Sequence, residues 1–219
     1  MKKQYFLSAP RTEETVWFLR HSNVSVTLGL VGIGVEDVRS AHADGSNHPL
    51  MRSKWTDGSP AWKRDSLDAA EALAQQCLGE RVTVLTTGPV TDVAKALLLH
   101  PEIAERIDEI LILGGSESFG DVTPAAERNF YNDPEAAWTV LNSGVPIVLF
   151  GLELWRETAH PTELLARYLH DPSQFATEAA GVQVETRGTI TLGKCVNDLN
   201  SDKQFEKNVL YVRRENASC

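Results

Sequence analysis

Residues 110–137 have the sequence ILILGGSESFGDVTPAAERNFYNDPEAA. The aliphatic run Ile110–Leu113 predicts a strand that is buried on both faces, and the glycine pair that follows ends it. After a polar loop, Asp133-Pro134-Glu135 predicts the start of a helix, because proline fits the first helical turn and acidic side chains stabilise its positive end. This single stretch therefore predicts a buried strand, a polar loop and a helix in succession.

The same alternation of strand and helix continues on both sides of this stretch. It predicts an α/β fold with an open, mainly parallel sheet flanked by helices. In such folds ligands collect at the loops after the carboxyl ends of the strands, here the loops that begin near Thr86, Gly114 and Gly151. Strands are predicted for Tyr5–Leu7, Val24–Leu28, Val82–Leu85, Ile147–Phe150, Val182–Thr186 and Val209–Val212, and helices for Leu67–Cys77, Thr91–Leu99 and Pro134–Asn142.

The composition limits the class of protein. The chain has 219 residues, of which 42% are hydrophobic, as expected for a single globular domain over residues 1–219. Its formal net charge is −9, so we expect no nucleic acid as a partner. The longest apolar run, Val145–Phe150, is far too short to cross a membrane. Three dispersed cysteines predict neither a disulfide framework nor a zinc site, and therefore a cytoplasmic protein.

The polar loop of the first stretch carries a candidate ligand site. Asp121, Glu127 and Asn129 bring carboxylate oxygens and an amide close together in the sequence. Such a cluster suits the adjacent hydroxyls of a sugar. The same residues fit, equally well, a loop that is capped by its own polar side chains.

A longer resemblance includes these residues. The stretch from Leu113 to Ala137 resembles the signature GGA…GNxTPxAEFNxxxDPEAA of the inosine/uridine-preferring nucleoside hydrolases. Leu85–Ala94 is similar to the LxxGPLTNxA loop of that family, Val148–Glu153 to its strand ending in GLD, and Val184–Gly193 to its VETxGxxTxG segment. The resemblance extends from about Val82 to Asp198 and implies the fold of that family.

This resemblance implies hydrolysis of the N-glycosidic bond of a ribonucleoside by a calcium-bound water. Glu127 and Asn129 match the ribose-binding Glu and Asn of the family, and Thr91 matches a residue whose carbonyl binds calcium. Asp121 stands where the family has Asn, which places an anion beside the sugar. A hard divalent cation held by six to eight oxygens lowers the pKa of its water and orients the sugar.

The amino-terminal segment departs from the family's DxDPGxDD motif. The sequence Leu7-Ser8-Ala9-Pro10-Arg11-Thr12-Glu13-Glu14 aligns with it without a gap. Leu7 replaces the Asp that the resemblance assigns to calcium binding and proton abstraction, Ala9 replaces a second Asp, and Arg11 replaces the glycine. We expect Glu13 to contact substrate and Glu14 to bind metal, or both to be the solvated start of a helix. Calcium binding is therefore predicted to be weak or lost.

The segment between about residues 155 and 181 is short compared with the family, whose longer helical region carries an HD motif. His170-Asp171 can be that motif, with His170 catalytic and Asp171 a calcium ligand. Alternatively, Leu169–Phe175 corresponds to a downstream LxDPSxF segment of the family, and the HD motif is absent. We favour the second alignment because Ser173 and Phe175 also match.

Two functions are compatible with these sequence features. The first is a ribonucleoside hydrolase of impaired activity, with Glu14, Thr91 and Asp171 as its remaining calcium ligands. The second is a non-catalytic protein of the same fold that binds ribose or a nucleoside or interacts with a partner. A homo-oligomer is also considered, because five tryptophans can leave aromatic surface exposed.

Overall fold

The computed structural model describes residues 3–10, 13–30, 69–156, 158–188, 190–198 and 207–213. Arg11 lies outside these residues. The strands are β1 (Gln4–Ala9), β2 (Val26–Leu30), β3 (Val82–Thr86), β4 (Ile107–Leu113), β5 (Ile147–Phe150), β6 (Ala176–Val184), β7 (Cys195–Asp198) and β8 (Val209–Arg213). The helices are α1 (Glu13–His21), α3 (Ala69–Gly79), α4 (Thr91–Leu99), α5 (Arg128–Asn132), α6 (Pro134–Leu141), α7 (Leu152–Trp155) and α8 (Thr162–His170), with short 3₁₀ helices η3 (Pro101–Arg106) and η4 (Pro172–Gln174).

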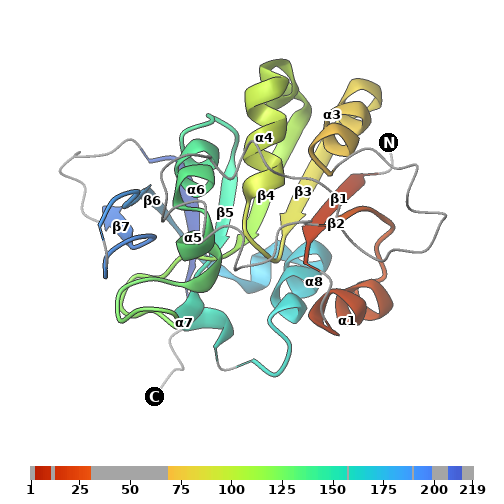
Figure 1. The fold of residues 1–219 in the computed structure, drawn as a ribbon. Helices are drawn as coiled ribbons and strands as arrows, with labels where there is room; N and C mark the ends of the chain where they lie inside the picture. Colours follow the sequence, from red (N-terminus) through yellow and green to blue (C-terminus); the bar gives the residue numbers. More distant parts are fainter. Residues whose placement is uncertain are drawn as a thin grey trace.

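The described strands form one open sheet in the order β2-β1-β3-β4-β5-β8-β6-β7. The pairs from β2 to β8 are parallel, whereas β6 runs antiparallel to both β8 and β7. The α/β fold with an open, mainly parallel sheet is therefore confirmed (Figure 1). Because parallel strands point the same way, their carboxyl ends and the loops that follow them gather at one edge of the sheet.

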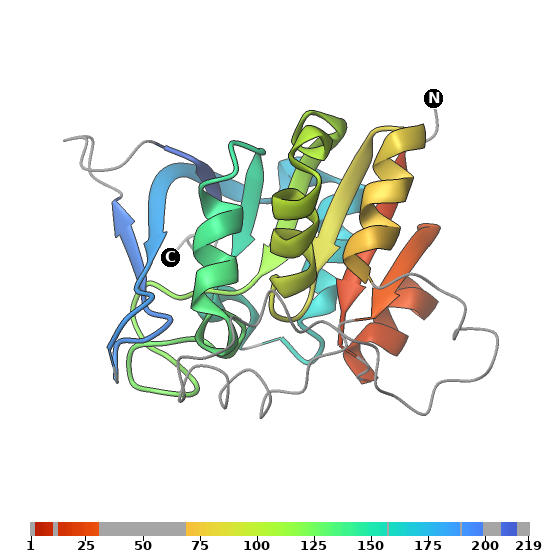
Figure 2. The same ribbon diagram turned by 45° about the horizontal axis from the view of Figure 1, so that its top comes forward.

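Helices cover both faces of this sheet. On one face of the sheet lie α3, α4 and α6, as Figure 2 shows. Side chains of the strands such as Phe6, Val84 and Ile110 form a core with these helices. On the other face Leu7, Leu85 and their neighbours on the strands pack against α1 and α8. The central strands are consequently buried on both sides, which explains why their sequences are continuous aliphatic runs. No helix in the described part of the chain is both long and apolar enough to span a membrane.

Two strands differ from their predicted positions. β2 begins at Val26 rather than Val24, and Asn23, which lies between α1 and β2, has a positive φ of 54°. β6 begins at Ala176, well before the predicted Val182. Its first half pairs with β8 and its second half with β7, so two different partners support one long strand. The segment 176–180 lacks the apolar alternation that reveals a strand in sequence.

Gly193, in the turn between β6 and β7, allows a prediction about stability. Its φ is +74°, and a Cβ there would lie 2.4 Å from the Cα of Tyr131 in α5. Gly144 has a similar φ of +79° but has nothing within 4 Å of such a Cβ. We expect Gly144→Ala to lower the free energy of unfolding by about 1 kcal/mol through backbone strain alone. Gly193→Ala should cost at least about 2 kcal/mol more, because the backbone of α5 must move.

Urea denaturation of both variants measures this difference. Equal losses would show that the turn at Gly193 does not pack against α5.

Candidate functional site

A cavity of about 280 Å³ lies at the carboxyl edge of the sheet. Residues that follow or end three central strands contribute to it, namely Pro10 after β1, Thr87 after β3 and Leu113 of β4. Its other lining residues are Glu14, Asp121, Glu127, Arg128, Asn129, Trp155, Pro161 and Thr162. The volume is close to the lower end of the range for small-molecule sites, about 300 Å³. The fold therefore places a ligand-sized cavity where an open α/β sheet is expected to have one.

Glu127 is the most deeply buried acid in the cavity wall, with 1% of its surface exposed. Its Oε2 accepts hydrogen bonds from Gly115 N at 2.9 Å and Phe130 N at 3.2 Å, and its Oε1 accepts one from Asn129 N at 2.8 Å. The side chain therefore caps the amino terminus of α5 and fixes the turn after β4. Burial raises the pKa of Glu127 to about 7, although these backbone donors oppose the rise.

Asn129 and Asp121 complete this wall. Asn129 donates from Nδ2 to the carbonyl of Leu113 at 2.8 Å, so its amide oxygen is the atom that can accept from a ligand. Asp121 Oδ1 accepts a hydrogen bond from Arg128 N at 2.8 Å. The side chains of this loop thus cap the loop itself and also line the cavity, whereas the binding of a sugar by them stays a prediction.

Of the acids near the amino terminus, only Glu14 lines the cavity. Its Oε1 lies 3.1 Å from His160 Nδ1, and its Oε2 lies 3.3 Å from Thr162 Oγ1. Glu13 is exposed at the start of α1 and is absent from the lining. The two neighbouring acids therefore have different surroundings, which the sequence did not distinguish.

The other predicted site residues lie outside the cavity lining. Thr91 donates from Oγ1 to Asp133 Oδ2 at 2.6 Å, which joins the start of α4 to the start of α6. His170 ends α8 and Asp171 follows it, whereas Thr162 at the opposite end of that helix lines the cavity. Nine helical residues span about 13 Å, so Asp171 is distant from the cavity end of α8.

Asp171 instead caps the short helix η4. It accepts hydrogen bonds from Ser173 Oγ at 2.6 Å and Gln174 Nε2 at 3.0 Å. These bonds hold the pKa of Asp171 below its usual value. This local role agrees with the alignment in which Asp171-Pro172-Ser173 starts a downstream turn.

The residues that would have to hold calcium do not fit that ion. Leu7 and Ala9 are fully buried and pack in the apolar core between the sheet, α1 and α8. Calcium takes six to eight oxygen ligands, and these two positions supply no side-chain oxygen. Among the described residues no group of three or more His, Cys, Asp and Glu side chains could hold a metal ion. Glu14, the remaining acid, already accepts hydrogen bonds from α8 and the residues before it.

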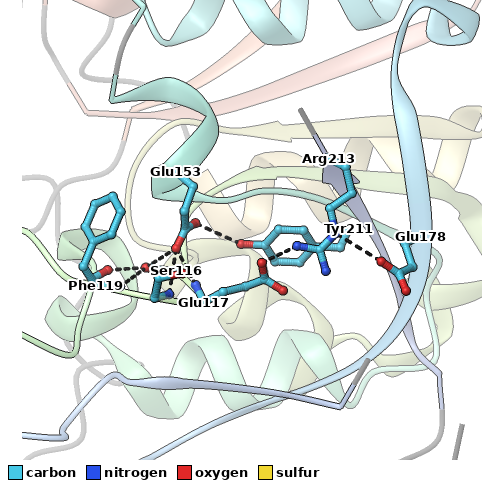
Figure 3. A network of polar contacts seen from close by, with 8 residues as sticks. Ser116, Glu117, Phe119, Glu153, Glu178, Tyr211 and Arg213 are labelled. Atoms are coloured by element: carbon cyan, nitrogen blue, oxygen red, sulfur yellow. Dashed lines mark hydrogen bonds and ion pairs between the residues drawn. The ribbon is translucent and has the colours of Figure 1, made fainter. Parts of the chain in front are cut away.

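Glu153 of α7 organises the loop that carries Asp121 and Glu127 (Figure 3). Its Oε1 accepts hydrogen bonds from Ser116 Oγ and Glu117 N, both at 2.7 Å, and from Ser118 N at 2.8 Å. Burial raises the pKa of Glu153, but the hydrogen bonds from Ser116 and the loop backbone outweigh burial and lower it. The carboxylate of Glu153 therefore holds the first residues of this loop, Ser116 to Ser118, by hydrogen bonds.

The same network ties the loop to the last described strand. Tyr211 of β8 donates to Glu153 Oε2 at 3.2 Å. Arg213 forms ion pairs with Glu117 and, at 3.2 Å, with Glu178 of β6, as Figure 3 shows. Residues far apart in the sequence thus hold the cavity wall, so its shape depends on the complete sheet.

Several lining residues were not predicted from the sequence, among them Trp155, Pro161 and Thr162. Trp155 ends the short helix α7, which begins two residues after β5. This place, close to the carboxyl end of a central strand, could have marked Trp155 as a lining residue. Nothing in the sequence marked His160 or Thr162, because their place depends on how α8 packs on α1.

Comparisons with known proteins agree on one family. A model described as "Inosine-uridine preferring nucleoside hydrolase" matches residues 20–171. The chain is 44% identical over 183 residues to an Escherichia coli protein named "Pyrimidine-specific ribonucleoside hydrolase RihA", and the match covers 64% of this chain and 59% of that protein. It is 34% identical over 183 residues to the protein of the same name from Citrobacter koseri, with the same coverage. The chain thus spans about 59% of the length of these relatives.

Solved structures share the fold. A plant nucleoside hydrolase, PpNRh1, superposes with a TM-score of 0.73 at 17% identity and covers 98% of this chain and 95% of its own. An inosine-uridine preferring nucleoside hydrolase from Bacillus anthracis gives a TM-score of 0.70 at 19% identity, with coverage of 98% and 95%. At these identities the likeness supports the architecture alone.

The burial of Glu127 predicts a pH dependence of stability. Its pKa rises from 4.5 to about 7 on folding, so the folded protein binds more protons than the unfolded chain in this window. The stabilisation is fully present below about pH 4.5 and is lost as the pH rises through about 7. The loss attributable to Glu127 should be on the order of 3 kcal/mol.

Glu127→Gln removes the titrating group and serves as the reference. Chemical denaturation across this pH range should show the wild type approaching or falling below the variant as the pH rises. Parallel pH profiles for the two proteins would contradict the assignment to Glu127.

The contacts of Glu153 predict that Glu153→Ala loosens the loop after β4. Removing the carboxylate leaves Ser116 Oγ and the N–H groups of Glu117 and Ser118 without their acceptor, at a cost of about 1–3 kcal/mol. Amide exchange at Glu117 and Ser118 should accelerate. Glu178→Ala, which removes an exposed partner of Arg213, should change stability by less than about 1 kcal/mol and leave those amides protected. Equal exchange in both variants would show that Glu153 does not hold the loop.

Proposed function

Because the chain belongs to the inosine-uridine preferring nucleoside hydrolase family, we propose that its cavity binds the ribose of a ribonucleoside and that N-glycosidic hydrolysis is impaired. The observation that carries this proposal is the cavity wall formed by Asp121, Glu127 and Asn129 at the carboxyl edge of the sheet. These side chains are the ones that the resemblance assigns to the sugar. The names of these relatives, pyrimidine-specific and inosine-uridine preferring, support a pyrimidine or purine ribonucleoside as the class of ligand.

The wall is suited to vicinal hydroxyl groups. A sugar hydroxyl can donate to the Glu127 carboxylate and a neighbouring hydroxyl can donate to the amide oxygen of Asn129. Backbone N–H groups and the Leu113 carbonyl hold both acceptors before a ligand arrives. Little conformational freedom is then lost on binding, which favours affinity for a small ligand.

The apolar side chains of Leu7 and Ala9 near the end of β1 support the proposal that hydrolysis is impaired. In the hydrolysis a water oxygen bonds to C1′ of the ribose, the bond to the base nitrogen breaks, and one proton must leave the water. Neither Leu7 nor Ala9 can accept that proton, and the described acids of the lining are Glu14, Asp121 and Glu127. The buried aliphatic side chains also favour the second candidate, a non-catalytic protein that binds ribose or a nucleoside.

We also propose that the protein is cytoplasmic and has no nucleic acid among its partners. Cys77 and Cys195 are free and buried, which supports a cytoplasmic location. The net charge of −9 supports the exclusion of nucleic acid from its partners. The chain spans about 59% of the length of the Escherichia coli relative, so the activity, substrates and partners of that longer protein are only proposed for it.

Ribose binding tests the site directly. We expect D-ribose and uridine to bind weakly in titration calorimetry, and Glu127→Ala to lower the affinity at least about tenfold by removing a charged hydrogen-bond acceptor. Glu105→Ala, which removes an exposed acid of η3, serves as the control and should bind as the wild type does. Equal binding by Glu127→Ala and the wild type would remove this wall from the proposed function.

Release of base from uridine and inosine, followed by chromatography, tests the second half of the proposal. We expect turnover far below the common enzymatic range of about 1–10³ per second. Turnover within that range would contradict impaired hydrolysis.

Calcium affinity tests the interpretation of the amino-terminal segment. We expect the wild type to bind Ca²⁺ no tighter than about 10⁻⁴ M, because the site has lost ligand charge. Ala9 precedes the cavity-lining Pro10, so Ala9→Asp should add an oxygen near the cavity and raise the affinity. Leu7→Asp places a carboxylate deeper in the core and should mainly destabilise the fold.

The combined variant Leu7→Asp, Ala9→Asp and Arg11→Gly restores the family's motif most fully. Should it fold as the wild type does yet bind calcium no better in calorimetry, the alignment of the amino-terminal segment is wrong.

A further inference from the structure

The carboxylate of Glu14 contacts two side chains, one just before α8 and one at its first residue. His160 Nδ1 lies 3.1 Å from Oε1, and Thr162 Oγ1 lies 3.3 Å from Oε2 and 3.3 Å from the Glu14 carbonyl oxygen. A carboxylate can only accept hydrogen bonds, so the hydrogen of this imidazole contact is on Nδ1. Glu14 and Thr162 both line the cavity. The contact therefore sets the position of the one carboxylate that the β1–α1 side contributes to the cavity lining.

His160 is itself fixed by a column of stacked rings. It stacks on Trp17 of α1 with ring centroids 5.0 Å apart and an angle of 17° between the planes. On its other side Trp17 stacks on His21 at 4.6 Å and 21°. Helices α1 and α8 are in contact, and Figure 1 shows them together at the carboxyl end of the sheet. The imidazole that meets Glu14 is thus held by an aromatic support instead of projecting freely into solvent.

This arrangement differs from that of a calcium site. There, several carboxylates meet at one cation, which balances their charge and fixes their directions. Here the two positions to which the resemblance assigns such carboxylates hold the buried side chains of Leu7 and Ala9. The acid that is left, Glu14, has an imidazole for its partner, which forms an ion pair with it when protonated. One carboxylate and one imidazole need no metal to be held in a defined geometry.

We propose that His160 takes the place of a metal cation as the partner of Glu14, so that the cavity binds a sugar without a divalent cation. His160 is then a positioning residue: it orients Glu14 through Nδ1 and does not line the cavity itself. Each carboxylate oxygen can accept more than one hydrogen bond, so Glu14 keeps acceptor capacity for a sugar hydroxyl. Together with the wall of Glu127 and Asn129, the cavity then presents acceptors from two sides to a neutral ligand rich in hydroxyl groups.

The inference rests on the proposed ribose binding and is tested by calorimetry with D-ribose on the full chain. We expect the wild type to have the same affinity in EDTA as in calcium chloride. His160→Ala should weaken binding about tenfold, the effect of one hydrogen bond to a charged group. His100→Ala is the matched control, because it removes another partly exposed imidazole that pairs with a carboxylate, that of Glu71, and His100 does not line the cavity. It should bind ribose as the wild type does.

Added imidazole separates positioning from a general structural role. His160 is 43% exposed, so free imidazole can enter the space that His160→Ala leaves beside Glu14. We expect imidazole to restore ribose affinity to His160→Ala and to have no effect on His160→Ala combined with Glu14→Gln. A loss that imidazole does not restore, or an equal loss in His100→Ala, would overturn the role of His160.

The calorimetry distinguishes a failure of the metal-free site from a failure of the proposed ribose binding. Ribose binding by the wild type that EDTA abolishes and calcium restores would overturn the metal-free site while leaving ribose binding intact. Absence of ribose binding in both EDTA and calcium would overturn the proposed function and this inference with it.

Discussion

The burial of the central strands on both faces is the constraint on which the rest of this protein depends. Strands β1, β3, β4 and β5 lie between α3, α4 and α6 on one side and α1 and α8 on the other. Most side chains within these strands are buried and apolar, because burying a polar group without a hydrogen bond costs free energy. The polar side chains that can meet a ligand therefore lie at the edge where the strands end. Leu7 and Ala9 are among the buried apolar side chains, so these two positions of β1 supply no oxygen ligand.

Two buried glutamates give the edge its shape. Glu127 binds the turn after β4 to the start of α5, and Glu153 gathers the next residues of the same loop from α7. Both carboxylates accept several hydrogen bonds from backbone N–H groups, which compensates part of the cost of burying a charge. The balance differs between them: burial prevails at Glu127 and raises its pKa, whereas the hydrogen bonds prevail at Glu153 and lower its pKa. The two carboxyl groups therefore differ in pKa: that of Glu127, beside the cavity, is raised to about 7, and that of Glu153, behind the loop, is lowered.

The two sides of the cavity have different origins. The wall of Asp121, Glu127 and Asn129 comes from one continuous stretch that follows a single strand. The opposite side brings together Glu14 of α1 and Thr162 of α8, which are 148 residues apart in the sequence. The first side therefore depends on the local sequence after β4. The second side, with His160 stacked on Trp17, depends on how α1 and α8 pack together.

The sequence by itself determined the α/β fold, its mainly parallel sheet and the family, because continuous aliphatic runs and the stretch 110–137 encode buried strands and a polar loop locally. It also brought Asp121, Glu127 and Asn129 together, since these residues share one loop. It did not distinguish Glu13 from Glu14, did not reveal the first half of β6, and left two places open for Asp171. Only the tertiary structure decided these points, because each depends on partners remote in the sequence: His160 and Thr162 for Glu14, β8 for β6, and the length of α8 for Asp171. Local pattern determines which element forms, whereas the contacts between elements determine which side chains meet.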